Sequence, residues 1–293
     1  MKIDNLESIA ILGIGLLGGS LGMAIEKHMP GVKKFGYSRN IESTKKALQK
    51  GAIDVVCETI PEAVKEAQMV VLCSPLGTFE ALMEAMKDSL QDGAIITDVG
   101  STKVLPRDLA KKILPKHVEF LGSHPMAGAE QQGVDYSMAD LFDGAHCVLT
   151  PEKKNSAKTL KFLHDFWGKL GMMVCEMTAV THDKTVAAIS HLPHVIASSL
   201  MNISRPVHTE ICGKGFLDTT RIASGPEGMW RDIMMANTGN IADSIDKMIK
   251  ELEGFRDSLR VENDKKVLKK LGDAREKRKE LLLQKLRTRE LLS

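Results

Sequence analysis

The sequence predicts an α/β N-terminal domain with a doubly wound, mostly parallel sheet, followed by an all-α C-terminal domain. Three observations favour this fold class. A glycine-rich turn joins the first apolar run to the first amphipathic run, the two kinds of run then alternate as far as Met177, and helical spacing continues alone from there. We therefore expect an α/β domain over residues 1–177 and a helical domain over residues 178–293.

Composition excludes several other classes of protein. The 293 residues carry 40 Lys and Arg against 38 Asp and Glu, and only 4% are aromatic, so neither net charge nor stacking side chains indicate a nucleic-acid partner. The five cysteines are an odd number without metal-ligand spacing, which indicates reduced thiols in the cytoplasm and no metal site. The uncharged stretch 8–25 is too rich in glycine for a membrane helix, so we expect no membrane partner.

The first element pair is a strand, a tight turn and a helix. Ser8–Leu12 is a short β-rich run, and an amphipathic run continues to about His28. The G-x-G-x-x-G turn between them allows backbone N–H groups and the positive end of the helix dipole to approach a pyrophosphate, as in a Rossmann domain. The residues expected at the phosphates are Gly13, Gly15, Leu16, Leu17 and Gly18.

The end of the second strand indicates which dinucleotide binds. An acidic residue about twenty positions after the glycines would hold the ribose hydroxyl of NAD, but Ser38 and Arg39 stand there instead. A hydroxyl beside a guanidinium is suited to a 2′-phosphate. NADP is therefore favoured and NAD stays possible, because Arg39 is also compatible with a solvated loop residue.

The later apolar runs end in residues suited to a ligand crevice, since ligands bind beyond the carboxyl ends of parallel strands. Met69–Cys73 is followed by Ser74 and Pro75, and Ala94–Thr97 by a loop that contains Gly100 and Ser101. His124 follows Phe120–Leu121 in a glycine-rich turn. The residues expected along this crevice are Ser74, Pro75, Gly100, Ser101 and His124.

His124 is the best candidate for chemistry among the nine histidines. At the edge of a cofactor crevice, a neutral imidazole can take the proton of a hydroxyl group whose carbon loses hydride. Ser101 is a natural hydrogen-bond partner that would fix the tautomer of this ring. The competing interpretation is a structural histidine without a role in chemistry.

Two further clusters lie in the helical part. His191 and His194 are three residues apart on one helix, where substrate contact is favoured over metal binding because no matching Cys or carboxylate is present. Arg221 follows Asp218, and Trp230 precedes a second Arg-Asp pair. An arginine in such a cluster suits a carboxylate anchor, although a structural ion pair is the alternative.

Helical spacing covers three stretches after Met177: 181–203, 229–259 and 261–292. From Lys265 onwards the tail carries eleven Lys and Arg against four Asp and Glu, with an apolar stripe of leucines. We interpret it as a helix packed on its own domain or on a partner subunit. A nucleic-acid arm is less favoured because acidic residues interrupt the basic run.

Six segments together resemble the prephenate dehydrogenase family of tyrosine biosynthesis. They are GLLGGSLG (15–22), DVGSTK (98–103), GSHPMAGAE (122–130), SHLPH (190–194), DTTRIASG (218–225) and MWRD (229–232). The resemblance runs nearly end to end. It implies a Rossmann domain, a helical domain that forms a homodimer, and oxidative decarboxylation of prephenate to 4-hydroxyphenylpyruvate.

The resemblance also implies roles for individual residues. His124 matches the histidine that accepts the proton of the ring 4-hydroxyl, Ser101 the serine that supports it, and Arg221 an arginine that binds a substrate carboxylate. Five other positions match residues of the substrate pocket or its entrance. They are His191, His194, Glu130, Asp218 and Trp230.

Several alternatives stay open at this point. Many bacterial members have Asp where this chain has Ser38, and some carry a regulatory domain for which this chain has no room. Members that use arogenate share most of the motifs, although His194 favours prephenate. Other readings are a β-hydroxyacid dehydrogenase, an imine reductase, or a non-catalytic NADP-sensing regulatory protein with a basic interaction tail.

Overall fold

The computed structural model describes residues 2–128 and 131–287. The chain forms two compact units, Met1–Asn237 and Thr238–Ser293, and each is considered separately. The first unit holds both sheets of the described chain and every candidate site residue that the structure describes. Glu130 lies outside the described residues.

The larger sheet of the first unit has six parallel strands in the order β3-β2-β1-β4-β5-β6. The order reverses between β1 and β4, which is the point at which doubly wound sheets bind their ligands. The predicted fold class is confirmed. The strands, in order along the chain, are β1 (Ser8–Leu12), β2 (Lys33–Tyr37), β3 (Val55–Val56), β4 (Met69–Leu72), β5 (Ile95–Asp98) and β6 (Glu119–Phe120).

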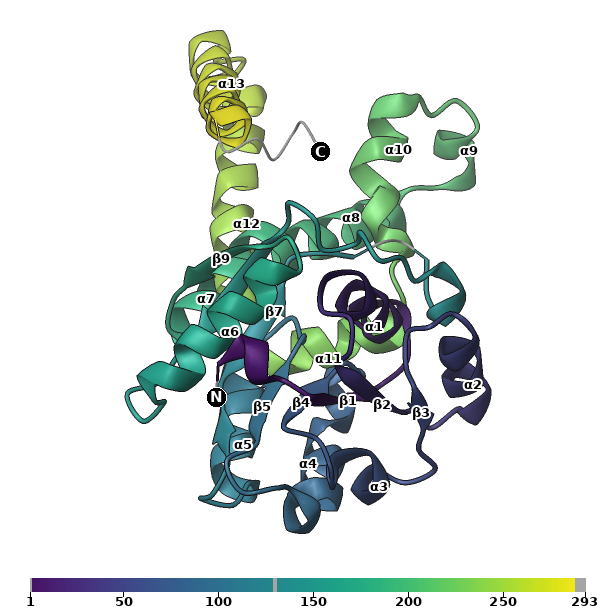
Figure 1. Ribbon diagram of the computed structural model, residues 1–293. Coiled ribbons are helices and arrows are strands. Elements are labelled where there is room, and N and C mark those ends of the chain that lie inside the picture. The colour runs from purple at the N-terminus through teal and green to yellow at the C-terminus, as the bar shows by residue number, and fades with distance from the viewer. Residues whose placement is uncertain (1, 129–130, 288–293) are drawn as a thin grey trace. The chain divides into compact units, whose positions relative to one another are not determined.

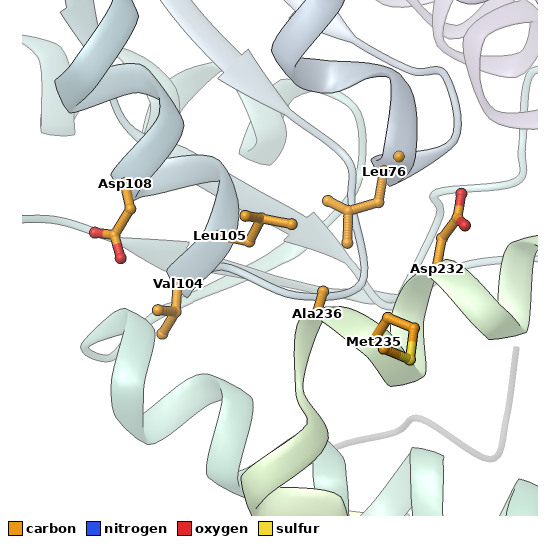
Figure 2. Close-up of a pocket in the computed structure, with 8 residues that line it drawn as sticks. Leu76, Val104, Leu105, Asp108, Asp232, Met235 and Ala236 are labelled. Atoms are coloured by element: carbon orange, nitrogen blue, oxygen red, sulfur yellow. The ribbon is translucent and has the colours of Figure 1, made fainter.

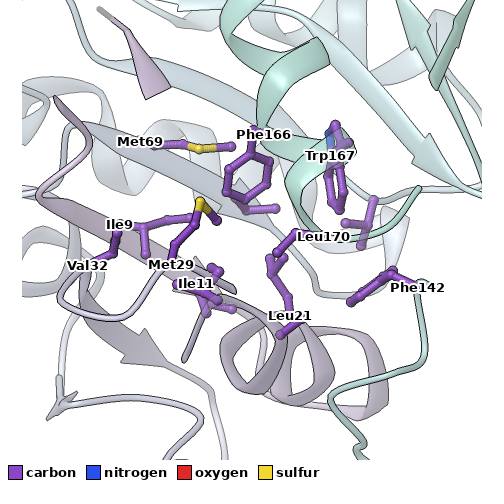
Figure 3. Packing of buried hydrophobic residues seen from close by; sticks show 14 of the residues in the cluster. Ile9, Ile11, Leu21, Met29, Val32, Met69, Phe142, Phe166, Trp167 and Leu170 are labelled. Atoms are coloured by element: carbon purple, nitrogen blue, oxygen red, sulfur yellow. The ribbon is translucent and has the colours of Figure 1, made fainter. Parts of the chain in front are cut away.

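Both faces of this sheet are buried, because successive side chains of a strand point to opposite sides. On β1, Ile9 and Ile11 join one core cluster while Ala10 and Leu12 join the other. Figure 3 shows the first cluster, in which Leu21, Phe166 and Trp167 lie on the same side of the sheet as Ile9 and Ile11. All of these side chains are nearly inaccessible to solvent.

Helices cover the two faces of the sheet (Figure 1). The face of the first cluster is covered by α1 (Leu16–His28), α2 (Ile41–Gln49) and α6 (Ala157–Lys169). The face of the second cluster is covered by α3 (Ile60–Val64), α4 (Phe79–Met86) and α5 (Val104–Ile113). Short 3₁₀ segments are η1 (Ile3–Asn5), η2 (Leu76–Thr78), η3 (Lys87–Ser89) and η4 (Val134–Tyr136).

A second sheet of three strands begins where β6 ends. Leu121 makes the last backbone hydrogen bond to β5, from its N–H to the carbonyl of Ile96 at 3.1 Å, and the chain then passes into β7 (Gly122–Pro125). This strand pairs antiparallel with β8 (His146–Thr150), which pairs parallel with β9 (Met173–Glu176). The expectation that His124 lies in a turn is therefore wrong, since it lies within a strand.

The helical part of the first unit begins with a continuous stretch, Ala179–Ile203, that is long and apolar enough to cross a membrane by length and composition alone. It packs on α5, η6 and α10 of the same unit, and a π-helical segment interrupts it after its second turn. The elements are α7 (Ala179–Val186), η5 (Ala187–His191, the π segment), α8 (Leu192–Ile203), α9 (Pro206–Thr209), α10 (Lys214–Thr220), η6 (Arg221–Ser224) and α11 (Glu227–Ala236).

The second unit is a pair of helices, α12 (Thr238–Arg260) and α13 (Asp264–Arg287). Lys270 joins them through an ion pair with Glu251 at 2.8 Å and a contact 5.0 Å above the ring of Phe255. The predicted helix over 229–259 is wrong at one place, because α11 ends before Asn237 and α12 begins after it. Several large apolar side chains of α13 are exposed, namely Leu268, Leu271, Leu281, Leu282 and Leu283.

We expect Leu21→Ala to lower the free energy of unfolding by about 2–5 kcal/mol, because a cavity would remain in the first core cluster. Leu48→Ala is the matched control, since that side chain on α2 is 45% exposed and its loss should change stability by about 0.5 kcal/mol or less. Urea unfolding followed by circular dichroism measures both. Equal effects of the two substitutions would contradict this description of the core.

Candidate active site

The turn between β1 and α1 admits only glycine at two positions. Gly13 has φ +109°, and a Cβ there would lie 2.4 Å from the backbone nitrogen of Ser74. A Cβ on Gly18 would lie 2.0 Å from the carbonyl oxygen of Gly13. The strand, the turn and the first turn of the helix are therefore packed against each other and against the end of β4.

The N-terminus of α1 is suited to a phosphate group. Its N-cap is Gly15, no side chain of the described residues accepts a hydrogen bond from the N–H groups of its first turn, and a Cβ on Gly15 would meet nothing within 4 Å. Leu16, Leu17 and Gly18 form this first turn. Unsatisfied N–H groups together with the helix dipole make such a terminus an anion site.

A cavity of about 200 Å³ lies beside this turn. Six of the residues predicted to bind the cofactor line it, whereas Leu16, Leu17, Gly18 and Gly100 do not. Gly100 instead donates its N–H to Asp98 at 2.9 Å. The structure thus brings the glycine turn and the ends of β2 and β4 to one place. The lining residues are Gly13, Ile14, Gly15, Tyr37, Ser38, Arg39, Cys73, Ser74, Pro75, Thr78 and Leu82.

The wall formed by the end of β2 carries a positive charge and no carboxylate. Arg39 is exposed, and no acidic residue is among the described residues that line the cavity. Lys45 and Lys46, which lie on the next helix, are held by Glu42 at 2.9 Å and Asp135 at 2.7 Å. Within the described residues, the guanidinium of Arg39 is therefore the cation on this wall.

A buried ion pair joins the end of β5 to the start of α5 and to β7. The Lys103 ammonium contacts the carboxylate of Asp98, and both side chains are fully buried. Lys103 also donates to the carbonyl of Ser123 at 2.7 Å, while Asp98 accepts the N–H of Ser123 at 3.3 Å. The residue before His124 is thereby fixed on both its backbone groups.

His124 is the first member of a chain of buried hydrogen bonds. Its Nδ1 lies 2.8 Å from Nε2 of His182, and Nδ1 of His182 lies 2.8 Å from the carboxylate of Asp183. Burial, together with the positive charge of nearby Lys103, holds the pKa of the His124 imidazole well below its usual value. The ring is therefore neutral at physiological pH.

The predicted partner of this ring was wrong. His182, and not Ser101, contacts Nδ1 of His124, and the described residues include no hydrogen bond between Ser101 and that imidazole. Ser101 lies half-buried in the loop between β5 and α5. Sequence reasoning missed His182 and Asp183 because adjacent His and Asp residues on a helix carry no signal of what the helix packs against.

A second group of rings surrounds the π-helical segment. His194 stacks on Trp230 with ring centroids 3.6 Å apart and an interplanar angle of 12°, and His191 meets the same indole edge-on at 6.2 Å. Burial lowers the pKa of His191 to about 4 and also lowers that of His194. Nε2 of His191 and Nδ1 of His194 are buried without a hydrogen-bond partner in the described structure. The structure thus brings together three of the predicted substrate residues.

Asp218 and Arg221 lie elsewhere, on the wall of a cavity of about 760 Å³ formed by α8, α10 and η6. The ring cluster and this cavity meet at η6. The backbone of Ile222 is hydrogen-bonded to His194, while Arg221 and Ala223, on either side of Ile222, line the cavity. Arg221 is therefore close to the ring cluster along the chain, but it lines the 760 Å³ cavity, which is not lined by His191, His194 or Trp230.

A third cavity, of about 370 Å³, lies between η2, α5 and α11 (Figure 2). Its ionisable lining residues are Asp108 and Asp232, whose carboxylates each contact the preceding arginine at 2.8 and 2.7 Å. The remaining lining is apolar apart from the backbone at Gly77. Because carboxylates line this cavity, it is a poor place for an anionic ligand.

Comparison with known proteins identifies the family. Residues 21–176 match the nucleotide-binding domain of prephenate dehydrogenase, and residues 178–273 match the prephenate dehydrogenase dimerization domain. The chain belongs to the prephenate dehydrogenase family. The matched nucleotide-binding range begins within α1, so the glycine turn at Gly13–Gly18 and the cavity wall that it forms lie just before it.

Individual members of the family are similar to this chain over most of its length. A prephenate dehydrogenase of Bacillus subtilis is 35% identical over 85% of this chain and 69% of its own length. A cyclohexadienyl dehydrogenase of Zymomonas mobilis is 33% identical over 86% and 88%. The solved prephenate dehydrogenase of Aquifex aeolicus, in complex with hydroxyphenyl propionate and NAD+, is 33% identical with a TM-score of 0.88 over 94% of this chain and 99% of that one.

We expect Gly15→Ala to weaken binding of the dinucleotide about tenfold or more without unfolding the protein. The added methyl group meets no protein atom but occupies the space in front of the α1 N-terminus. Gly168→Ala on α6 is the control, since it also meets nothing and should leave binding unchanged. Titration of cofactor fluorescence measures the dissociation constants. Equal affinities of the two variants would contradict a phosphate site at the N-terminus of α1.

Proposed function

We propose that this protein converts prephenate to 4-hydroxyphenylpyruvate by oxidative decarboxylation, with NADP+ favoured and NAD+ second as hydride acceptor. The observation that carries this proposal is the neutral, buried His124, held through Ser123 at the end of β5 in a chain of the prephenate dehydrogenase family. The free ends of β1 and β4 at the same edge of the sheet hold the glycine turn and Ser74.

The reaction needs a base, a hydride acceptor and a fixed substrate, and no strong acid or metal. When bound, the oxidised nicotinamide supplies the hydride acceptor. His124 takes the proton of the ring hydroxyl as the carbinol carbon is oxidised. The bond to the ring carboxylate then breaks, CO2 leaves, and its electron pair completes the aromatic ring, whose oxygen takes a proton back to give the 4-hydroxyl of the product. Positioning supplies most of the rate enhancement, because aromatisation makes the step strongly downhill.

The remaining candidate residues hold the substrate in this proposal. Arg221 binds a carboxylate of prephenate as a bidentate partner, and His191 and His194 contact its polar groups beside Trp230. Ser101 contacts the reacting end, while Asp218 and Glu130 order the entrance. The unpartnered ring nitrogens of His191 and His194 support these assignments, because buried polar atoms of this kind are normally satisfied by a ligand or water.

Arogenate is the second candidate substrate. It differs from prephenate by a protonated amine in place of the side-chain ketone, and an acidic partner would favour it. The ring cluster of His191, His194 and Trp230 is neutral, which supports prephenate. This chain is also similar to a solved arogenate dehydrogenase of Synechocystis, at 25% identity with a TM-score of 0.81. Arogenate is therefore included among the substrates of the assay below.

We also propose a functional boundary after Met177, a homodimer formed through the C-terminal helices, and a cytoplasmic location. The description of the matched family domain over 178–273 as a dimerization domain supports the dimer. The exposed leucines of α13 give it an apolar surface.

The test is a cofactor-reduction assay with prephenate and arogenate, each with NADP+ and NAD+. Growth of absorbance at the reduced-nicotinamide band together with release of CO2 is the expected result with prephenate. Binding of cofactor without turnover of either acid would instead indicate a nucleotide-sensing protein. A higher kcat/KM for arogenate would reverse the order of the two substrates.

We expect His124→Asn to lower kcat by about 10²-fold or more with little change in KM, because a general base contributes about 10²–10⁴-fold. Since the pKa of His124 lies well below the ordinary histidine value, the wild-type kcat/KM should stay constant through neutral pH and fall only in clearly acidic solution, as protons bind the ring. That acidic decline should be absent from the variant. Full turnover by the variant would remove His124 from the chemistry.

Replacing Ser38 by Asp together with Arg39 by Ile should shift the preference from NADP+ toward NAD+. The change removes the cation of the cavity wall and adds a carboxylate that repels a 2′-phosphate. The ratio of kcat/KM for the two cofactors measures the shift. A wild-type protein that already prefers NAD+ would contradict the role given to Arg39.

A further inference from the structure

The backbone and side chain of one residue, Asp183 on α7, connect the two groups of histidines. Its carboxylate contacts His182, which contacts His124, and its carbonyl oxygen accepts a hydrogen bond from the amide of Asn237 at 2.7 Å. That same amide nitrogen lies 3.3 Å from Nδ1 of His191. We propose that Asp183 is a positioning residue that sets opposite tautomers on the two site histidines, leaving Nε2 of His124 bare and Nε2 of His191 protonated.

The carboxylate of Asp183 fixes the tautomer of His182. It accepts the N–H groups of Lys103 at 2.7 Å and Val104 at 2.9 Å, so it caps the N-terminus of α5 and is held as an anion there. A carboxylate only accepts, so Nδ1 of His182 carries the hydrogen in the 2.8 Å contact.

The tautomer of His124 follows from that of His182. In the proposal the 1% exposed ring of His182 carries a single hydrogen, the one on Nδ1, so its Nε2 is an acceptor. Nδ1 of His124 must then donate to it, and the hydrogen of the neutral His124 ring is used there. Nε2 of His124 is left with a lone pair, which is the form that a base requires.

The carbonyl of Asp183 fixes the other histidine through Asn237. A carbonyl oxygen only accepts, so the group of Asn237 that faces it is the amide NH2, which removes the usual ambiguity of an Asn side chain. The second hydrogen of that group points to Nδ1 of His191, which accepts it. The hydrogen of the neutral His191 ring therefore lies on Nε2, the atom that is buried without a partner.

The two rings thereby acquire different tasks, an assignment that rests on the proposed function. His124 presents an acceptor for the hydroxyl proton, and His191 presents a donor for an oxygen of the substrate. One residue controls both because Asp183 and Asn237 are 1% and 5% exposed, and their hydrogen bonds do not compete with water.

The test is nitrogen NMR of the full chain labelled with ¹⁵N in histidine, at neutral pH and without substrate. Spectra of His124→Asn and His191→Asn assign the two rings by difference. We expect His124 to be protonated on Nδ1 and His191 on Nε2. The same tautomer on both rings, or a doubly protonated His182, would overturn the proposal, whether or not the protein turns over prephenate.

Two substitutions then separate the two arms of the network. Asn237→Asp places an acceptor against Nδ1 of His191, so the hydrogen of that ring should move to Nδ1 and KM for prephenate should rise about tenfold with kcat changed less than about threefold. Asp183→Asn should shift the hydrogen of His124 toward Nε2 and lower kcat by about 10²-fold or more.

Asp108→Asn is the matched control for Asp183→Asn. That carboxylate lies on α5, the helix whose N-terminus Asp183 caps, is exposed, and contacts only the neighbouring arginine among the described ion pairs. It should leave both tautomers and both kinetic constants unchanged. If Asp183→Asn lowers the thermal midpoint but leaves the His124 tautomer and kcat as in wild type, Asp183 is a helix cap only and the proposal is wrong.

Discussion

The fully buried contact between Asp98 and Lys103 is the constraint on which the rest of the site depends. A charge in such an interior costs several kcal/mol unless it is paired, so neither side chain is stable there without the other. The pair is formed only when the end of β5, the start of α5 and the first residues of β7 come together, since Gly100 and Ser123 supply the remaining hydrogen bonds. The position of His124 follows from this packing.

The same interaction helps to keep the ring of His124 neutral. Lys103 places its positive charge close enough to His124 to oppose protonation of that ring, and its own backbone N–H helps to hold the carboxylate of Asp183. The negative charge of Asp183 in turn reaches the ring only through His182. None of these charged groups forms an ion pair with His124 in the described structure, and such a pair would have raised the pKa of this ring.

Local patterns predicted the fold, while the contacts between distant elements were not predictable. The glycine turn after β1 and the continuous apolar runs of β1 and β4 carry their signal in neighbouring residues, and the structure has them as expected. His182 contacts His124 across 58 positions, and no pattern in either segment states this pairing. Likewise Asn237, which is neither Gly nor Pro, ends α11 where the spacing predicted a continuous helix, and its side chain is instead bonded to Asp183.

The arrangement also separates the residues proposed to select the cofactor from the proposed base. Ser38 and Arg39 lie at the end of β2, two strands away from β4 in the larger sheet, whereas His124 lies in the second sheet beyond β5. No hydrogen bond or ion pair of the described residues joins Arg39 to the network of Asp98, Lys103 and Asp183. Residues at the end of β2 are thus able to change between members of the family, one of which was solved with NAD+, while the charges that govern His124 stay as they are.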